Sequence, residues 1–145
     1  MTTLLPLEHA ETDADVAACF ELMQQLRPHL SAPDELVARV AVQRAQQYRL
    51  LAMWDGRRPV ALAGYRQVDN LIHGRFLYVD DLVTDERERG RSHGERMIDA
   101  LREIGRSHRC GKLVLDTALS NVLAQRFYFR AGMLPRALRF SEDLQ

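Results

Sequence analysis

The sequence predicts a single α/β domain with a mixed, mostly antiparallel sheet, and three observations support this fold class. Its 145 residues, 46% hydrophobic and 28% charged, suffice for one hydrophobic core. Apolar residues recur with a helical period in some segments and form strand-like runs in others. The elements follow the order β-α-α-β-β-β-α-β-α-β without a linker, repeat or low-complexity segment, so residues 1–145 are expected to fold as one domain.

The N-terminal third is expected to hold one strand and two helices. Thr2 to Leu7 is a short apolar run typical of a first or edge strand. Thr12 or Asp13 can cap a helix that Pro28 helps to end, and Pro33 stands in the first turn of the next helix. The apolar positions that form their buried faces are Val16, Cys19, Phe20, Met23 and Leu26, then Leu36, Val37, Val40 and Ala41.

Three strands follow, joined by turns. Tyr48–Trp54 and Val60–Gln67 flank Asp55-Gly56, which is a typical hairpin turn. A looser turn, Asp69–Gly74, leads into the longest strand, Arg75–Thr84. Hairpins of this kind make neighbouring strands antiparallel.

The C-terminal part alternates helices and strands. A helix is expected from Gly94 to His108, a short strand from Lys112 to Thr117, a helix from Asn121 to Ala131, and a last strand from Leu134 to Phe140. The first helix joins two strands as a right-handed crossover, which places those strands side by side and parallel.

Composition excludes several classes of protein. Twenty basic and twenty acidic residues cancel, and no basic stripe typical of nucleic-acid binding is present. No apolar run approaches the roughly 18 residues of a membrane span, and Met1 to Leu7 lacks the positive charge of a secretory signal. Cys19 and Cys110 are therefore expected to be reduced thiols in a cytoplasmic protein. The five histidines lack zinc-ligand spacing, so no metal site is expected.

The segment Arg89-Gly90-Arg91-Ser92-His93-Gly94 joins the longest strand to its helix. Free backbone N–H groups and the helix dipole make such a turn a seat for phosphate. Arg89 and Arg91 add positive charge, and the small residues Gly90, Ser92 and Gly94 leave room for a pyrophosphate. Taken alone, the pattern also fits a solvated loop.

A second motif runs from Asn121 to Met133, where Asn121 can cap a helix. Together the two segments resemble the signatures of the GNAT superfamily of N-acetyltransferases. The first signature is Arg/Gln-x-x-Gly-x-Gly/Ala, with Ser92 replacing the first glycine. The second is Asn-x-x-Ala-x-x-Phe-Tyr-x-x-x-Gly-Phe, with Met133 replacing the last residue. The resemblance is strong from Tyr78 to Met133, and the element order extends it to the whole chain.

The resemblance implies an enzyme that transfers an acetyl group from acetyl-CoA to a primary amine. The residues that it implies in coenzyme binding are Leu82, Val83, Thr84, Arg89, Gly90, Arg91, Ser92, His93, Gly94 and Asn121. Of these, His93 is expected mainly to pack. The family's tyrosine approaches the thioester sulfur, so Tyr128 is expected to protonate the leaving thiolate, the alternative being a core aromatic with its hydroxyl at the rim.

Two carboxylates are candidates for the base. An alkyl amine has a pKa of about 10.4, so it arrives protonated, and a carboxylate can attract and deprotonate it. The run Leu77–Leu82 resembles the strand of diamine acetyltransferases in which an acidic residue at the position of Asp80 is the base. We therefore rank Asp80 first and Asp81 second, with solvent-exposed or capping roles as the alternative. Strand alternation predicts that their side chains point to opposite faces.

Other functions stay open. Neither thiol is expected to be activated, since Cys110 follows a helix and Cys19 lies on a buried face, which favours direct transfer in a ternary complex. The acceptor could instead be a protein N-terminus or lysine, or the chain could be a non-catalytic coenzyme A or nucleotide-binding module. A structural protein ranks last. The apolar C-terminal strand and the family resemblance favour a homodimer.

Overall fold

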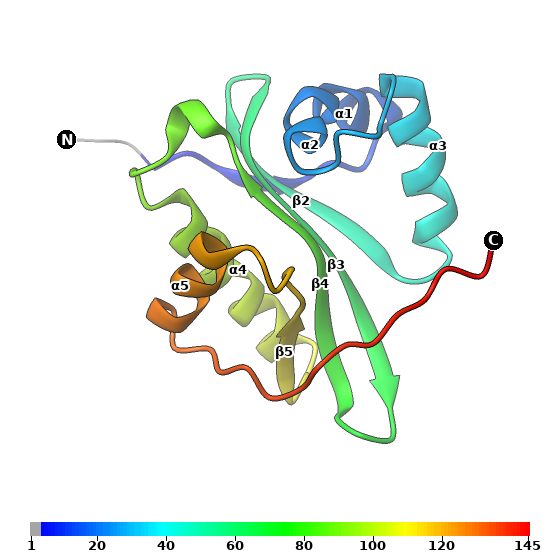
Figure 1. Ribbon diagram of the computed structural model, residues 1–145. Helices are drawn as coiled ribbons and strands as arrows, with labels where there is room; N and C mark the ends of the chain where they lie inside the picture. The colour runs from blue at the N-terminus through cyan, green and yellow to red at the C-terminus, as the bar shows by residue number, and fades with distance from the viewer. Residues whose placement is uncertain (1–3) are drawn as a thin grey trace.

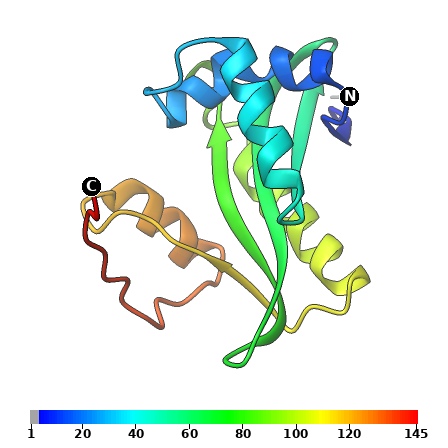
Figure 2. The same ribbon diagram turned by 90° about the vertical axis from the view of Figure 1, so that its right-hand side faces the viewer.

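The computed structural model describes residues 4–145 as a five-stranded sheet in the order β1-β2-β3-β4-β5 with helices packed around it (Figures 1 and 2). The strands are β1 Leu7–His9, β2 Tyr48–Asp55, β3 Arg58–Asn70, β4 Gly74–Thr84 and β5 Lys112–Leu115. The helices are α1 Asp13–Ala18, α2 Phe20–Leu26, α3 Pro33–Arg44, α4 His93–Ser107 and α5 Val122–Arg130, with a short 3₁₀ turn, η1, at Glu86–Glu88. Within residues 4–145 no helix is both long and apolar enough to cross a membrane.

Strand pairing confirms the predicted fold class. The β1–β2, β2–β3 and β3–β4 pairs are antiparallel, and β4 and β5 are parallel neighbours joined through α4. The hairpin turn predicted at Asp55-Gly56 is present: Asp55 pairs with Arg58, and Gly56 adopts a φ of +64°, which glycine reaches without strain.

Two apolar clusters cover the two faces of the sheet. On one face α1, α2 and α3 pack against β2 and β3, with Leu50 and Leu62 fully buried. On the other face α4 packs against β3 and β4, burying Ala63 and Leu77. Neighbouring residues of a strand serve opposite clusters, because side chains alternate across a sheet.

The N-terminal elements differ from the prediction in two ways. The strand expected at 2–7 partly falls outside the described residues, and the strand that forms is Leu7–His9, paired with β2. The helix expected to be continuous is divided at Cys19, whose N–H donates to the Val16 carbonyl at 3.0 Å. This three-residue spacing tightens the chain into a 3₁₀ turn between α1 and α2.

The last strand, predicted at 134–140, does not form. After α5 the chain crosses in front of the sheet in Figure 1 and stands away from it in Figure 2, so that it does not join the sheet, and its residues are exposed. Residues 134–145, the C-terminal tail, make no backbone–backbone hydrogen bond to the described chain. Apolar composition predicts a strand, but a strand also needs a partner edge, and the fold brings none to the tail.

Candidate active site

Strands β4 and β5 separate halfway along β4. They pair only from Phe76 with Lys112 to Val79 with Leu115, whereas β4 continues to Thr84 with β3 as its partner. The N–H of Asp85 donates to the Val60 carbonyl on the β3 side at 2.9 Å. Because successive residues of a strand turn their N–H groups to alternate sides, those of Leu82 and Thr84 face the open edge.

Asp80 and Asp81 stand where the strands separate, and the expectation that they point to opposite faces is wrong. Tyr65 of β3 pairs with Val79, and Gly64 pairs with Asp81, so Asp80 is the extra residue of a β-bulge. A bulge interrupts side-chain alternation. Both carboxylates consequently lie on the face that α1–α3 cover.

Each of these carboxylates has a charged partner. Arg66 of β3 donates to both oxygens of Asp80, at 2.8 and 2.9 Å. Asp81 accepts from the Tyr48 hydroxyl at 2.8 Å and from Arg27 at 3.0 Å. Burial, and then the charge of Asp81, raise the pKa of Tyr48 well above its usual value, so the hydroxyl remains a donor.

Gly64 makes the Tyr48–Asp81 contact possible. A Cβ at this position would lie 1.9 Å from the Tyr48 hydroxyl oxygen and 2.8 Å from an Asp81 oxygen. The absent side chain leaves the space that the two groups need.

The turn before α4 has the backbone geometry of an anion seat. Gly90 and Ser92 adopt positive φ values of 82° and 62°, and Ser92 is the N-cap of α4 without a side-chain capping bond. Over the described chain, the N–H groups of residues 89–95 have no hydrogen-bond partner. These free donors and the positive end of the α4 dipole fit the pyrophosphate of coenzyme A.

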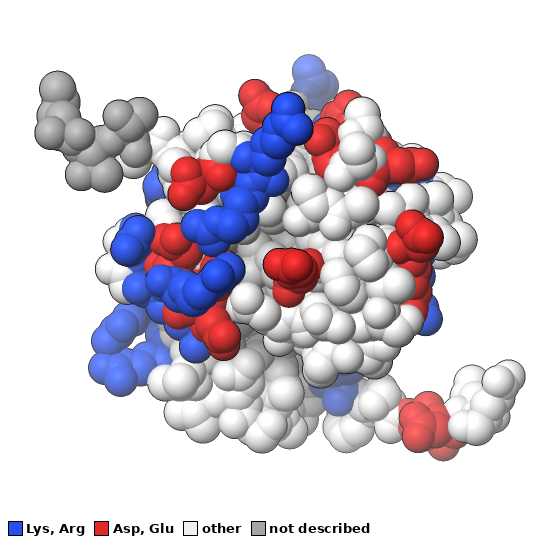
Figure 3. Space-filling model, turned by 90° about the horizontal axis from the view of Figure 1, so that it is seen from above, with Lys and Arg blue, Asp and Glu red and all other residues white. Residues whose placement is uncertain are grey.

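Ion pairs stabilise residues 85–88, which lead into this turn. Asp85, 2% exposed, accepts hydrogen bonds from the side chain and the N–H of Arg87, which hold its pKa well below the usual range, and it also accepts one from Arg58. Glu88 pairs with Arg58 at 3.0 Å and with Arg91 at 2.9 Å. Figure 3, which looks down on the molecule from above in Figure 1, shows basic and acidic side chains interleaved on this side. Arg91 is therefore partly engaged by Glu88.

His93 and Gly94 begin α4 and pack inward. The His93 ring is 11% exposed, its Nε2 lies 3.7 Å from Glu88, and neither ring nitrogen has a hydrogen-bond partner among the described residues. A Cβ at Gly94 would come within 3.2 Å of the Phe127 ring of α5. The small residue at 94 thus lets α5 approach the start of α4.

Helix α5 presents the residues of the second motif. Asn121 caps it, accepting from the Ala124 N–H at 3.1 Å through its side-chain oxygen, as expected. Tyr128 is half-buried, and burial alone raises its pKa above the usual value. No side-chain partner holds its hydroxyl within the described residues, so that group is free to donate to a ligand.

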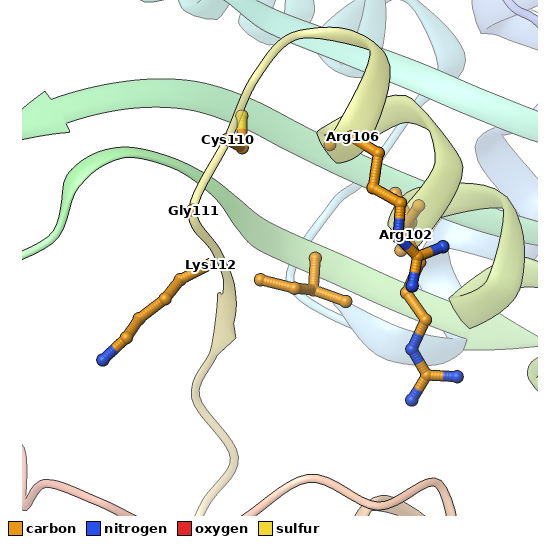
Figure 4. Close-up of a pocket in the computed structure, with 8 residues that line it drawn as sticks. Arg102, Arg106, Cys110, Gly111 and Lys112 are labelled. Carbon is orange, nitrogen blue, oxygen red and sulfur yellow. The ribbon is translucent and has the colours of Figure 1, made fainter.

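A shallow cavity of about 200 Å³ lies away from these groups. It opens between the last turns of α4 and the start of β5, lined by Arg102, Arg106, Cys110 and Lys112 among others (Figure 4). Burial raises the pKa of Cys110, and it raises the pKa of Cys19 to about 12. The prediction that neither thiol is activated is confirmed, with burial as the dominant cause at both positions.

Sequence reasoning missed the partners of the carboxylates. Arg27, Tyr48 and Arg66 come from three separate elements, and no short motif contains them. Asp116, just after β5, was also missed although it accepts hydrogen bonds from Tyr78 and Arg139. These residues come together through the pairing of the strands, and the sequence alone does not show that pairing.

The turn of free amides beside the open edge of the sheet fits a ligand that carries phosphate. Residues 15–133 match the acetyltransferase (GNAT) family, and the chain belongs to this family. It is accordingly an N-acetyltransferase that uses acetyl-CoA. The finer resemblance of Leu77–Leu82 to diamine acetyltransferases stays a prediction.

Individual relatives agree with the family. The chain is 24% identical over 125 residues, 86% of its own length and 88% of the relative's, to an uncharacterized N-acetyltransferase, YhdJ, of Bacillus subtilis. It is 29% identical over 69 residues, 48% of this chain and 44% of the relative, to glucosamine 6-phosphate N-acetyltransferase of Arabidopsis thaliana. The structure of an aminoglycoside N-acetyltransferase, AAC(6')-Iy, in complex with CoA has the same fold, with a TM-score of 0.81, 14% identity and coverage of 100% of this chain and 99% of that one.

Proposed function

We propose that this N-acetyltransferase transfers the acetyl group directly to a primary amine within a ternary complex. The observation that carries the proposal is the run of N–H groups at residues 89–95 without a partner in the described chain, which follows the open edge of β4 after the short turn η1. A diphosphate on that run directs the rest of an extended donor along the strand edge toward Asp80 and α5. Because neither Cys19 nor Cys110 is activated, a covalent acetyl-cysteine step has no support.

Backbone and side-chain donors share the binding of acetyl-CoA in this proposal. The turn residues Gly90 and Ser92 present their amides, and Arg89 is exposed and adds positive charge. Leu82, Val83 and Thr84 contribute the strand edge. Asn121 uses its oxygen to cap α5, which leaves its NH₂ group for the pantetheine arm. His93, Gly94 and Arg91 support the turn through their packing and ion pairs.

In this proposal β4, which carries Asp80 and Asp81, and α5, which carries Tyr128, have separate roles. Asp80 is the preferred base because Leu77–Leu82 resembles the strand of diamine acetyltransferases that carries the base; the hydrogen bonds do not rank the two carboxylates, since Arg66 engages Asp80 as Tyr48 and Arg27 engage Asp81. The amine nitrogen, once deprotonated, attacks the thioester carbonyl carbon, and the Leu82 N–H at the open edge stabilises the oxyanion. As the carbon–sulfur bond breaks, the Tyr128 hydroxyl donates its proton to the leaving sulfur.

Replacing Tyr128 by phenylalanine tests this assignment. Tyr128→Phe should lower kcat by at least about tenfold, while the Kd for acetyl-CoA, measured by calorimetric titration, changes little. A panel of primary amines and of peptides with free N-termini and lysines supplies the acceptors, with release of free coenzyme A as the readout. Tyr65→Phe is the matched control, since Tyr65 bonds His9 elsewhere on the sheet.

The pH dependence has a defined sign. Burial raises the pKa of Tyr128, so the donating form is present at neutral pH and is lost only as pH rises above about 10. A wild-type kcat in Tyr128→Phe, or an alkaline loss with a midpoint below pH 9 that the variant abolishes, would contradict the proposed role. Binding of acetyl-CoA without coenzyme A release on any acceptor would instead identify a non-catalytic binding module.

One further expectation accompanies this proposal. The homodimer rests on the apolar tail, and light scattering after size-exclusion chromatography measures it.

A further inference from the structure

Asp116 lies across from Asp80 at the point where β4 and β5 separate. Val79 and Leu115 form the last pair of the two strands, so the next residue on each strand is an aspartate. The Tyr78 hydroxyl donates to Asp116, and Arg66, which pairs with Asp80, lies 5.2 Å over the Tyr78 ring. Asp116 therefore belongs to the same face and the same opening as the proposed base.

The cation that pairs with Asp116 is held differently from the others. Arg66 comes from the adjacent strand and bonds Asp80 through two nitrogens, with 29% of its side chain exposed. Arg139 bonds Asp116 through one nitrogen at 2.8 Å and is 71% exposed. It belongs to the C-terminal tail, which makes no backbone–backbone hydrogen bond within residues 4–145. An exposed ion pair on such a segment contributes little free energy. Arg139 is the cation that a ligand displaces most easily.

Asp116 itself is fixed in place. Burial, followed by the hydrogen bond and charge of Asp116, raises the pKa of Tyr78 to about 12, so its hydroxyl stays protonated and keeps donating to the carboxylate at working pH. Removing Arg139 would thus leave an oriented carboxylate, 36% exposed, beside the opening of the sheet.

We propose that Asp116 binds the ammonium group of the acceptor and that Arg139 of the tail occupies this position until the acceptor displaces it. This inference rests on the proposed function and narrows it to cationic amines without a nearby anionic group. A carboxylate at the opening repels acceptors that carry phosphate next to the amine. The tail then competes with the acceptor for a single carboxylate.

Variants at both ends of the ion pair test the inference, with putrescine as the cationic probe and glucosamine 6-phosphate as the anionic one. Arg139→Gln should lower the KM for putrescine about threefold without changing kcat. Asp116→Asn should raise that KM at least about tenfold, and the double variant should match Asp116→Asn, because Arg139 acts only through Asp116. Arg136→Gln, on the same exposed tail, is the matched control and should change neither constant.

Binding measurements separate this inference from the proposed function. Calorimetric titration of putrescine into the coenzyme A-loaded protein should show the same order of affinities, Arg139→Gln tightest and Asp116→Asn weakest, whether or not turnover occurs. Equal putrescine affinity in all variants, no putrescine binding, or better use of glucosamine 6-phosphate than of putrescine by the wild type would overturn the inference. Turnover of other amines with normal coenzyme binding would leave the proposed function intact in each case.

Discussion

Helices α4 and α5 are neighbours in the fold but are held very differently. Helix α4 buries Met97, Ile98, Leu101 and Gly105, whereas α5 has no fully buried residue. The same contrast separates β2, mostly buried, from β5, whose residues are half-buried or exposed. The part of the molecule from β1 to α4 is a scaffold, and the part from β5 to the tail, which carries Asp116, Asn121 and Tyr128, is bound to it lightly.

The lightly held part also exposes apolar surface. Leu119, Val122 and Leu123 at the start of α5 are 86%, 68% and 75% exposed. Binding surfaces often show such patches before their ligand arrives. We therefore expect ligand binding to contribute more to the order of this part than of the scaffold.

The largest effect should come from a substitution in the scaffold that separates Tyr48 from Asp81. Gly64→Ala places a Cβ 1.9 Å from the Tyr48 hydroxyl, which must move away from Asp81. We expect a loss of about 2–4 kcal/mol in the free energy of unfolding, measured with urea. Gly105→Ala is the control, because its Cβ would lie 3.8 Å from Cys110 and alanine favours the helix by about 1 kcal/mol. An unchanged free energy of unfolding in Gly64→Ala would contradict the close approach of Tyr48 to Gly64.

Hydrogen exchange tests whether the part from β5 to the tail is held less tightly than the scaffold. Amides of α5 should exchange at least about 30-fold faster than those of α4, since local opening exposes little buried surface in α5. Saturating acetyl-CoA should slow exchange in α5 and in residues 89–95 more than in β2 and β3. Mass spectrometry of peptic fragments gives both values. Equal protection of the two helices in the free protein would remove the distinction between scaffold and lightly held part.

The smallest effect concerns the turn that leads into α4, within the scaffold. Ser92 adopts a φ of 62°, which glycine reaches without the Cβ clash. Ser92→Gly should raise the free energy of unfolding by about 0.5–1 kcal/mol. Gln47→Gly, at a φ of 70° in the scaffold, should give a similar gain without altering the Kd for acetyl-CoA. A loss of affinity in Ser92→Gly alone would show that the serine hydroxyl itself contacts the donor.

The sequence allowed most of the fold to be predicted, because the relevant signals are local. The hairpin at Asp55-Gly56, the helix cap at Asn121 and the buried stripe of α4 depend on neighbours a few residues away. The prediction of a strand at 134–140 was wrong because strand formation depends on distant residues. Its apolar residues have strand propensity, but pairing depends on a distant edge that the tail does not reach.

The sequence by itself determined the order of elements from β2 to α5, the phosphate-type turn at residues 89–94 and the candidate residues Asp80, Asp81 and Tyr128. Only the tertiary structure decided which face of the sheet Asp80 and Asp81 lie on and which residues they bond. A single extra residue in β4 turned Asp80 and Asp81 to one face, and the strand register supplied Arg66 and Tyr48 as their partners. The separation of β4 and β5 placed Asp116 opposite them. Register and bulges depend on how whole strands pair, so residues far apart in the chain decide them together.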